Sequence, residues 1–174
     1  MFNGFLRPVP SGVRNIKSIQ RGSFSYYNLA TLDVTINSVD TTKSIVYVSY
    51  KGGYGRADTD LIAAKISDAT TVNFSSGKAW AYAVTVSWIV IEFDSCVKSL
   101  QTGSVVASAA TTDVAITTVG VLKSFSVVSK KSTSTSTTNG YYKFTHHITS
   151  ATNLAITGQN ANTETYEWQV IEFK

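Results

Sequence analysis

A glycine-rich loop in the first half of the chain gathers the side chains best suited to bind a ligand. A sugar site uses aromatic faces, a bidentate donor and an acceptor. The loop carries all three kinds, on Tyr50, Tyr54, Arg56 and Asp58. Residues 50–60 therefore predict a carbohydrate-binding or partner-binding site. A solvated hairpin that binds nothing is the alternative interpretation.

Metal-ligating residues are few. His146 and His147 are the only histidines, and in a strand adjacent side chains point to opposite faces, so we expect one to be half-buried and the other exposed. A threefold axis could still bring copies of one histidine together around a metal ion. Asp58 and Asp60 are a fragment of a calcium loop without its other ligands. We expect no metal and no other cofactor.

Residues for acid–base or nucleophilic catalysis are not grouped. Glu92 and Glu172 are equivalents by internal duplication, and we expect each to accept hydrogen bonds at a strand end instead of forming a catalytic pair. The sequence has no Gly-x-Ser-x-Gly elbow, phosphate loop or dinucleotide fingerprint. Its many serines and threonines lack a recognisable base and orienting acid. We expect a protein that is not an enzyme.

These side chains are positioned by strands, and one strand occurs twice. Residues 88–93, Trp-Ile-Val-Ile-Glu-Phe, return at 168–173 as Trp-Gln-Val-Ile-Glu-Phe. Alternation predicts a core face on this strand. Its members are Val84, Val86, Trp88 and Val90 in the first copy, and Tyr166, Trp168 and Val170 in the second. The other face turns apolar at Ile89, Ile91 and Phe93, which predicts that another domain or subunit covers the strand's end.

The rest of the chain repeats as well. Residues 17–23 match 98–104 at an offset of 81, and residues 43–49 match 123–129 at an offset of 80. Each copy reads as about six short strands joined by polar turns, which is typical of a small antiparallel sandwich. We predict an all-β fold of two tandem, duplicated β-sandwich modules, residues 17–94 and 95–174, preceded by an extended N-terminal arm, residues 1–16.

The arm, which contains Pro8 and Pro10, also carries apolar side chains. Phe2, Phe5, Leu6 and Val9 are poorly placed in free solution, so we predict that the arm docks onto a neighbouring subunit. A frayed terminus is the alternative.

Composition narrows the class of protein. With 43% hydrophobic residues and a mean hydropathy of +0.04, the chain reads as a soluble globular protein. The net charge of +4 is spread singly, with Lys130-Lys131 as the densest pair, so we expect no nucleic-acid partner. No stretch resembles a signal peptide or approaches the ~20 apolar residues of a membrane span, so we expect no membrane insertion. Cys96, the only cysteine, predicts a linker thiol without an intrachain disulfide.

The repeated ends carry a family resemblance. Each copy opens with Gln-x-Gly-Ser, at residues 20–23 and 101–104, and the first closes with Val-x-Val-x-Trp-x-x-Ile-Glu. The pattern resembles the H-type lectin module of discoidin and snail agglutinins, and also a module found in small virion proteins of tailed bacteriophages. The match covers residues 17–93 and 98–173.

The resemblance implies a six-stranded sandwich and assembly as a homotrimer, with a pseudo-sixfold ring of six modules. It implies a non-enzymatic structural protein of a tailed-bacteriophage virion, a capsid decoration, fibre or tail component whose partners are other capsid or tail proteins. The alternative is a lectin-like module that binds a host surface glycan through residues 50–60.

Overall fold

The computed structural model describes residues 15–51, 61–77, 83–107, 109–132, 144–158 and 164–174. Within these residues the chain is all-β, as predicted, with one short 3₁₀ turn, η1 (Val121–Lys123), and four antiparallel three-stranded sheets. The arm, residues 1–14, lies outside the described residues, and with it Phe2, Phe5, Leu6 and Val9. No helix of the described part is long and apolar enough to cross a membrane.

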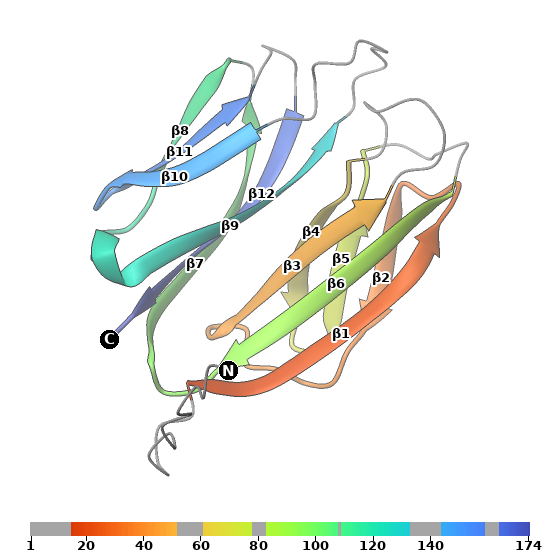
Figure 1. Ribbon diagram of the computed structural model, residues 1–174, viewed down its shortest axis with the longest axis horizontal. Coiled ribbons are helices and arrows are strands. Elements are labelled where there is room, and N and C mark those ends of the chain that lie inside the picture. The colour runs from red at the N-terminus through yellow and green to blue at the C-terminus, as the bar shows by residue number, and fades with distance from the viewer. Residues whose placement is uncertain (1–14, 52–60, 78–82, 108, 133–143, 159–163) are drawn as a thin grey trace, which may run out of the picture.

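The first module is a sandwich of two sheets with strand orders β1-β6-β3 and β2-β5-β4 (Figure 1). Its strands are β1 (Ile16–Tyr26), β2 (Thr31–Thr35), β3 (Ser44–Lys51), β4 (Ala63–Asp68), β5 (Thr71–Ser75) and β6 (Val84–Phe93).

The second module repeats this plan, with strand orders β7-β12-β9 and β8-β11-β10. Its strands are β7 (Val97–Ala107), β8 (Thr111–Ala115), β9 (Ser124–Ser132), β10 (Phe144–Ser150), β11 (Asn153–Gly158) and β12 (Glu164–Phe173). Irregularities in register also repeat: one lies near Ile16 and its counterpart Val97, and another follows Ile66 and its counterpart Ile148. The duplication seen in the sequence is therefore a duplication of the fold.

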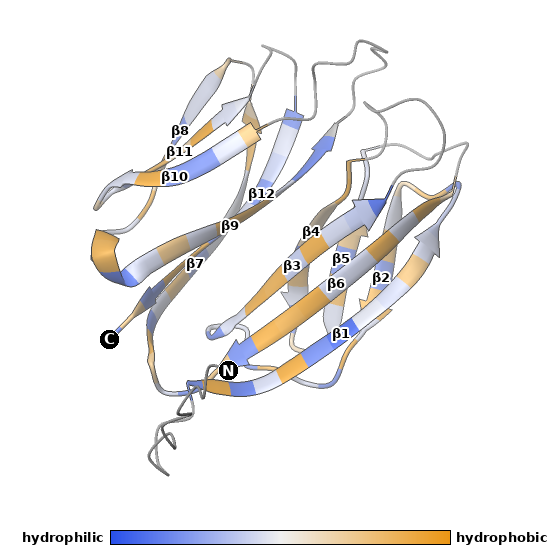
Figure 2. Cartoon of the chain, in the orientation of Figure 1, coloured by the Kyte–Doolittle hydropathy of each residue, from blue (hydrophilic) through white to orange (hydrophobic). Residues whose placement is uncertain are grey.

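Alternation along β6 separates two faces, as predicted. Val84, Val86, Trp88 and Val90 are all buried in the first core, between its two sheets. The side chains between them point outward, and along the strand they change from the polar Thr85 and Ser87 to the apolar Ile89 and Ile91. Figure 2 shows an orange, hydrophobic stretch near the arrowhead of β6. A strand with one core face and an apolar outer end needs a second cover at that end.

The Gln-x-Gly-Ser motif has a steric explanation. The indole of Trp88 lies over Gly22, so that a Cβ at position 22 would come within 2.7 Å of the Trp88 Cζ2 atom. Gly103 stands in the same relation to Trp168, at 2.5 Å. These pairs are directly opposite on neighbouring strands. Only glycine leaves room for the ring, which is why Gly and Trp recur together in both copies.

The glutamine of the motif ties the first strand of each module to a connecting segment. The Gln20 amide accepts from the Asn37 N–H at 2.7 Å and donates to the Asn37 carbonyl at 2.9 Å. Gln101 makes the same two bonds with Thr117, at 2.6 Å and 2.9 Å. The side-chain amide thus makes the same two hydrogen bonds with a peptide group that a neighbouring strand would make. It supplies hydrogen-bond partners for a backbone segment that lies outside the sheets.

Candidate functional site

The side chains predicted to bind a sugar are only partly placed. Tyr50 lies on β3, where its side chain is half-buried and packs against the first core. Tyr54, Arg56 and Asp58 lie outside the described residues, as does Asp60. The grouping of these residues into a binding site therefore stays a prediction.

The junction between the two modules joins residues from distant parts of the sequence. The outer face of the β7-β12-β9 sheet meets the edge of the first module, where β3 and β4 are the outermost strands of their sheets (Figure 1). An exposed strand edge presents unpaired peptide groups, which must find partners when it is buried.

Gln169 pairs with the edge of β3. Its Oε1 atom accepts a hydrogen bond from the Val46 N–H at 2.9 Å, and its Nε2 atom donates to the Val46 carbonyl at 2.8 Å. Both residues are buried, with 5% of Gln169 and 2% of Val46 exposed. The second module thus satisfies a strand edge with a side-chain amide, the device that Gln20 and Gln101 use within each module.

Ser129 forms hydrogen bonds with the peptide groups at the edge of β4. The Ala64 N–H donates to the Ser129 hydroxyl oxygen at 3.0 Å, and that hydroxyl lies 3.3 Å from the Ala64 carbonyl, to which it donates. Two polar side chains of one module therefore fix the register of two edge strands of the other. Displacing the modules by one residue would break all four bonds, so the junction is geometrically specific.

An apolar cluster closes the lower end of the junction. Its buried members are Ile45, Phe93, Val97 and Ile171. The Phe93 and Phe173 rings meet edge to face, with centroids 5.3 Å apart, and Phe125 stacks on Phe173 at 5.9 Å. The sequence predicted a second cover for the end of β6, and the cover is the second module of the same chain.

Cys96 lies in the linker between β6 and β7. It is a free thiol, partly buried against the junction cluster, and its Sγ atom lies 3.2 Å from the Asn15 carbonyl.

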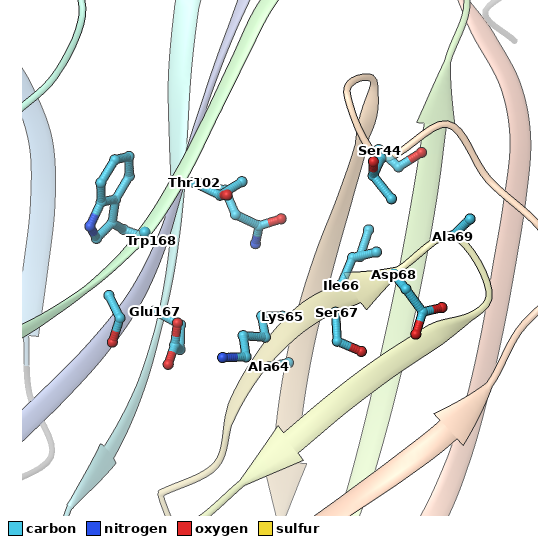
Figure 3. Close-up of a pocket in the computed structure, with 14 residues that line it drawn as sticks. Ser44, Ala64, Lys65, Ile66, Ser67, Asp68, Ala69, Thr102, Glu167 and Trp168 are labelled. Carbon is cyan, nitrogen blue, oxygen red and sulfur yellow. The ribbon is translucent and has the colours of Figure 1, made fainter.

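A polar cleft of about 520 Å³ opens beside the junction (Figure 3). Lys65, Ser67 and Asp68 line it from the first module, while Thr102, Ser104 and Glu167 line it from the second. The side chain of Lys65 extends toward Glu167, whereas the ring of Trp168 lies on the far side of its strand (Figure 3). Hydroxyls with one ammonium group and two carboxylates suit a small polar ligand, and the described lining presents no aromatic face to it.

The second core contains a buried ion pair that the sequence analysis missed. Lys130 Nζ lies 2.6 Å from Glu164 Oε1, with side chains 1% and 5% exposed, and the Tyr166 hydroxyl donates to Glu164 Oε2 at 2.6 Å. The ammonium also lies 5.8 Å from the centroids of the Phe144 and Tyr166 rings. The apolar surroundings separate this pair from solvent, so it belongs to the core and not to an open site.

Burial sets the protonation of this cluster. It lowers the pKa of Lys130, although the hydrogen bond to Glu164 opposes that shift. Burial likewise raises the pKa of Tyr166 far above its ordinary value, and the hydrogen bond to Glu164 adds to the increase. The phenol therefore stays protonated and remains a donor.

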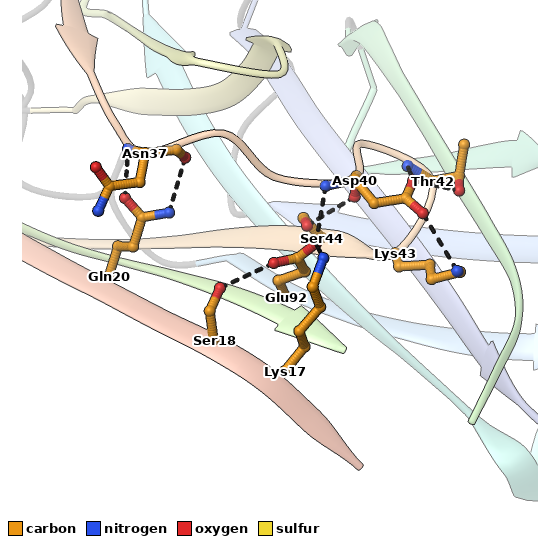
Figure 4. Close-up of polar contacts among 9 residues, drawn as sticks. All are labelled: Lys17, Ser18, Gln20, Asn37, Asp40, Thr42, Lys43, Ser44 and Glu92. Carbon is orange, nitrogen blue, oxygen red and sulfur yellow. Dashed lines mark hydrogen bonds and ion pairs between the residues drawn. The ribbon is translucent and has the colours of Figure 1, made fainter. Parts of the chain in front are cut away.

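Glu92 and Glu172 accept hydrogen bonds at strand ends, which confirms the prediction. Glu92 Oε1 lies 2.8 Å from Lys17 Nζ and accepts from the Asp40 N–H at 3.0 Å, while Oε2 accepts from the Ser18 hydroxyl at 3.0 Å (Figure 4). Glu172 repeats the arrangement with Lys98, Gly120 and Ser99.

The two carboxylates are held charged. Burial acts to raise the pKa of Glu92, but the hydrogen bonds from Lys17 and the Asp40 N–H outweigh it, and the pKa lies below its ordinary value. The hydrogen bond from Lys98, followed by the one from the Gly120 N–H, lowers the pKa of Glu172. Each carboxylate is a structural clasp that ties the first strand of its module to a connecting loop.

The histidines lie as predicted, one half-buried and one exposed, on β10. His146 Nδ1 is 2.8 Å from the Ser126 hydroxyl, and burial, together with the charge of His147, lowers its pKa. Among the described residues, no group of three or more His, Cys, Asp or Glu side chains could hold a metal ion.

Sequence reasoning missed Gln169 and Ser129 as contact residues. One signal was available for Gln169: it interrupts the second copy of a six-residue segment in which the first copy has Ile89. A glutamine where the equivalent strand has an isoleucine, next to the apolar Ile171 and Phe173 on the same face, indicates a buried polar partner. Ser129 gave no such signal, because Ser49 stands at its equivalent position.

Comparisons of the chain with models of protein families, with curated proteins and with solved structures find no match. The resemblance to the H-type lectin module therefore stays a prediction.

Proposed function

We propose that this chain is a non-enzymatic structural protein whose copies assemble into a homotrimer. The proposed location is the virion of a tailed bacteriophage, on the capsid surface or the tail, with other virion proteins as partners. The location follows from the sequence resemblance alone. Nucleic-acid binding and membrane insertion are not part of the proposal.

The observation that carries the proposal is the junction between the modules. Gln169 and Ser129 pair with the peptide groups of two edge strands, and an apolar cluster closes the same contact. Such a contact holds two sandwiches in one fixed relation and leaves no free hinge between them. A fixed pair of modules is a building block of defined shape, which favours a role in a symmetric assembly.

Native mass tests the proposal. Light scattering of the intact chain is expected to give three times 18.8 kDa, about 56 kDa, over a wide range of concentrations. The same measurement on a chain without residues 1–14, which precede β1, shows whether the arm is an intersubunit strap. A mass of 18.8 kDa for the intact chain at every concentration would contradict the proposal.

The polar cleft at the junction favours carbohydrate binding as a second candidate function. Its volume of about 520 Å³ suits one or two sugar rings, and Lys65, Asp68 and Glu167 could bind hydroxyl groups. A glycan array distinguishes two locations for such a site. Loss of binding in Lys65→Ala would assign it to the cleft, and loss in Tyr54→Ala to the loop of residues 50–60. No binding by the wild type would leave the structural role alone.

A further inference from the structure

The outer face of the β1-β6-β3 sheet is mostly apolar and partly uncovered. Two cross-strand rows form it: Ile19, Ile91 and Ile45 in one, and Arg21, Ile89 and Tyr47 in the next. Ile19 is 45% exposed and Tyr47 is 52% exposed. Side chains directly opposite one another on neighbouring strands pack together, so these rows are one continuous patch, which we call the β1-β6-β3 outer face.

In the second module, the equivalent surface is in contact with another module. The equivalent rows on its β7-β12-β9 sheet are Leu100, Ile171 and Phe125, then Thr102, Gln169 and Val127. There the first module lies against the sheet, and Ile171 is 1% exposed. The first module therefore covers the centre of this face and leaves Phe125 40% exposed. On the β1-β6-β3 outer face only Ile45 is buried, and Ile19 and Tyr47 are open.

One substitution indicates what kind of surface fits the open face. Gln169 pairs with the peptide group of a strand edge, but Ile89, at the equivalent position, has no hydrogen-bonding group. A strand edge placed on Ile89 would lose hydrogen bonds to water without replacement. The open face therefore suits an occupant whose peptide groups are already paired, such as the face of another sheet.

The open face also continues an interface that already exists. Ile45 and Ile91 belong both to the first row and to the apolar cluster between the modules. The exposed Ile19 and Tyr47 extend that cluster outward. The only charged residue of the two rows, Arg21, lies on β1 at the edge of its sheet and is exposed, so it can stay in solvent when the apolar side chains are covered.

We infer that the β1-β6-β3 outer face is the surface through which copies of this chain contact one another around the threefold axis of the proposed trimer. The inference rests on the proposed structural function and deepens it by naming the contact. Around that axis, apolar side chains of one copy cover the exposed Ile19 and Tyr47 of the next. The second module's equivalent face is used inside the chain, so the first module makes the contacts between subunits.

Native mass of single variants tests the inference. Ile19→Glu and Tyr47→Glu each place a charge in the patch and are expected to weaken assembly by about 30-fold or more, bringing the mass to 18.8 kDa at concentrations where the wild type is assembled. Val106→Glu is the matched control. Val106 is 58% exposed on the outer face of β7, and its variant should keep the wild-type mass.

The outcomes separate the inference from the function on which it rests. An assembled wild type whose Ile19→Glu and Tyr47→Glu variants stay assembled would overturn the inference and leave the proposed function intact. A wild type of 18.8 kDa at all concentrations would overturn both. A chain that assembles only after removal of residues 1–14 would show that its own arm covers the face, and would also overturn the inference.

Cross-linking tests the same contact without an added charge. Around a symmetry axis through the face, equivalent residues of different copies lie near one another. In a Cys96→Ala background, Tyr47→Cys is expected to form covalent dimers with a short bismaleimide, and Val106→Cys is not. Equal cross-linking at the two positions, or none at position 47, would overturn the inference.

Discussion

The two modules have the same strand order but fill the same part of the core with different chemistry. In the first module Tyr50, Val84 and Val86 stand where the second has Lys130, Glu164 and Tyr166. The first core is apolar there and is completed by an aromatic group, in which Phe24 contacts both Tyr26 and Phe74. The second core contains the buried ion pair.

The comparison shows which contacts the fold requires. Gly under Trp, the motif glutamine on a connecting segment and the glutamate clasp occur in both modules. The ion pair occurs in one, so the sandwich does not depend on it. The contacts that occur in both modules determine the course of the backbone. The other core positions need only side chains that fill the available volume, and any polar group buried there needs a hydrogen-bonding or charged partner.

The largest expected effect comes from breaking the ion pair. Lys130→Met leaves the Glu164 carboxylate buried without its partner and is expected to lower the free energy of unfolding by about 3–5 kcal/mol. Urea denaturation measures it. The matched variant, Lys130→Met with Glu164→Gln, removes both charges and leaves an acceptor for the Tyr166 hydroxyl. It should recover most of the loss, and a double variant as unstable as the single one would contradict this comparison.

A smaller loss of stability is expected from substitutions at the glycines that lie against tryptophan in both modules. Gly22→Ala and Gly103→Ala place a Cβ within 2.7 Å and 2.5 Å of a tryptophan ring, so each should destabilise its module by about 2–3 kcal/mol. Thermal unfolding followed by circular dichroism measures both. Ser23→Ala, at an exposed neighbouring position, is the control. Losses that differ strongly between the two glycines would show that the modules do not share this constraint.

One change removes the hydrogen-bonding difference between the two outer faces at positions 89 and 169. Gln169→Ile gives the second module the residue of the first and leaves the Val46 N–H and carbonyl without partners, at an expected cost of about 1–3 kcal/mol. Hydrogen exchange of the Val46 amide should accelerate, whereas exchange in the core of β5 should not. The reciprocal variant Ile89→Gln, on the open face, is expected to leave the exchange of Val46 unchanged.

The smallest effect should come from acid, and it should be similar in both modules. Glu92 and Glu172 have a pKa below the ordinary 4.5, so they bind fewer protons folded than unfolded. Their contribution to stability is complete above pH 4.5 and is lost as the pH falls through the lowered pKa. Urea midpoints between about pH 3 and pH 6 measure it. Glu92→Gln with Glu172→Gln should flatten that dependence, and an unchanged slope would contradict the assignment.

Much of the fold could be predicted from local pattern. Alternation along residues 84–93 marks the core face, and the repeat of the closing strand predicts two sandwiches, because strand faces and repeats are short-range properties of a sequence. The site was harder to predict. Three of the four residues grouped as a sugar site lie outside the described residues. Of the residues that join the modules, Phe93 was predicted to be covered, whereas Gln169 and Ser129 were not predicted as contact residues.

The sequence by itself determined the class of fold, the duplication and the core faces. Tertiary structure alone decided that Gln169 meets Val46, 123 residues away, and that Lys130 meets Glu164 inside the second core. The physical reason is that the periodicity of a strand's sequence indicates which face each side chain occupies. It does not indicate which distant peptide group or charge lies opposite that side chain. That depends on how completed sheets pack, and packing is decided by the whole chain.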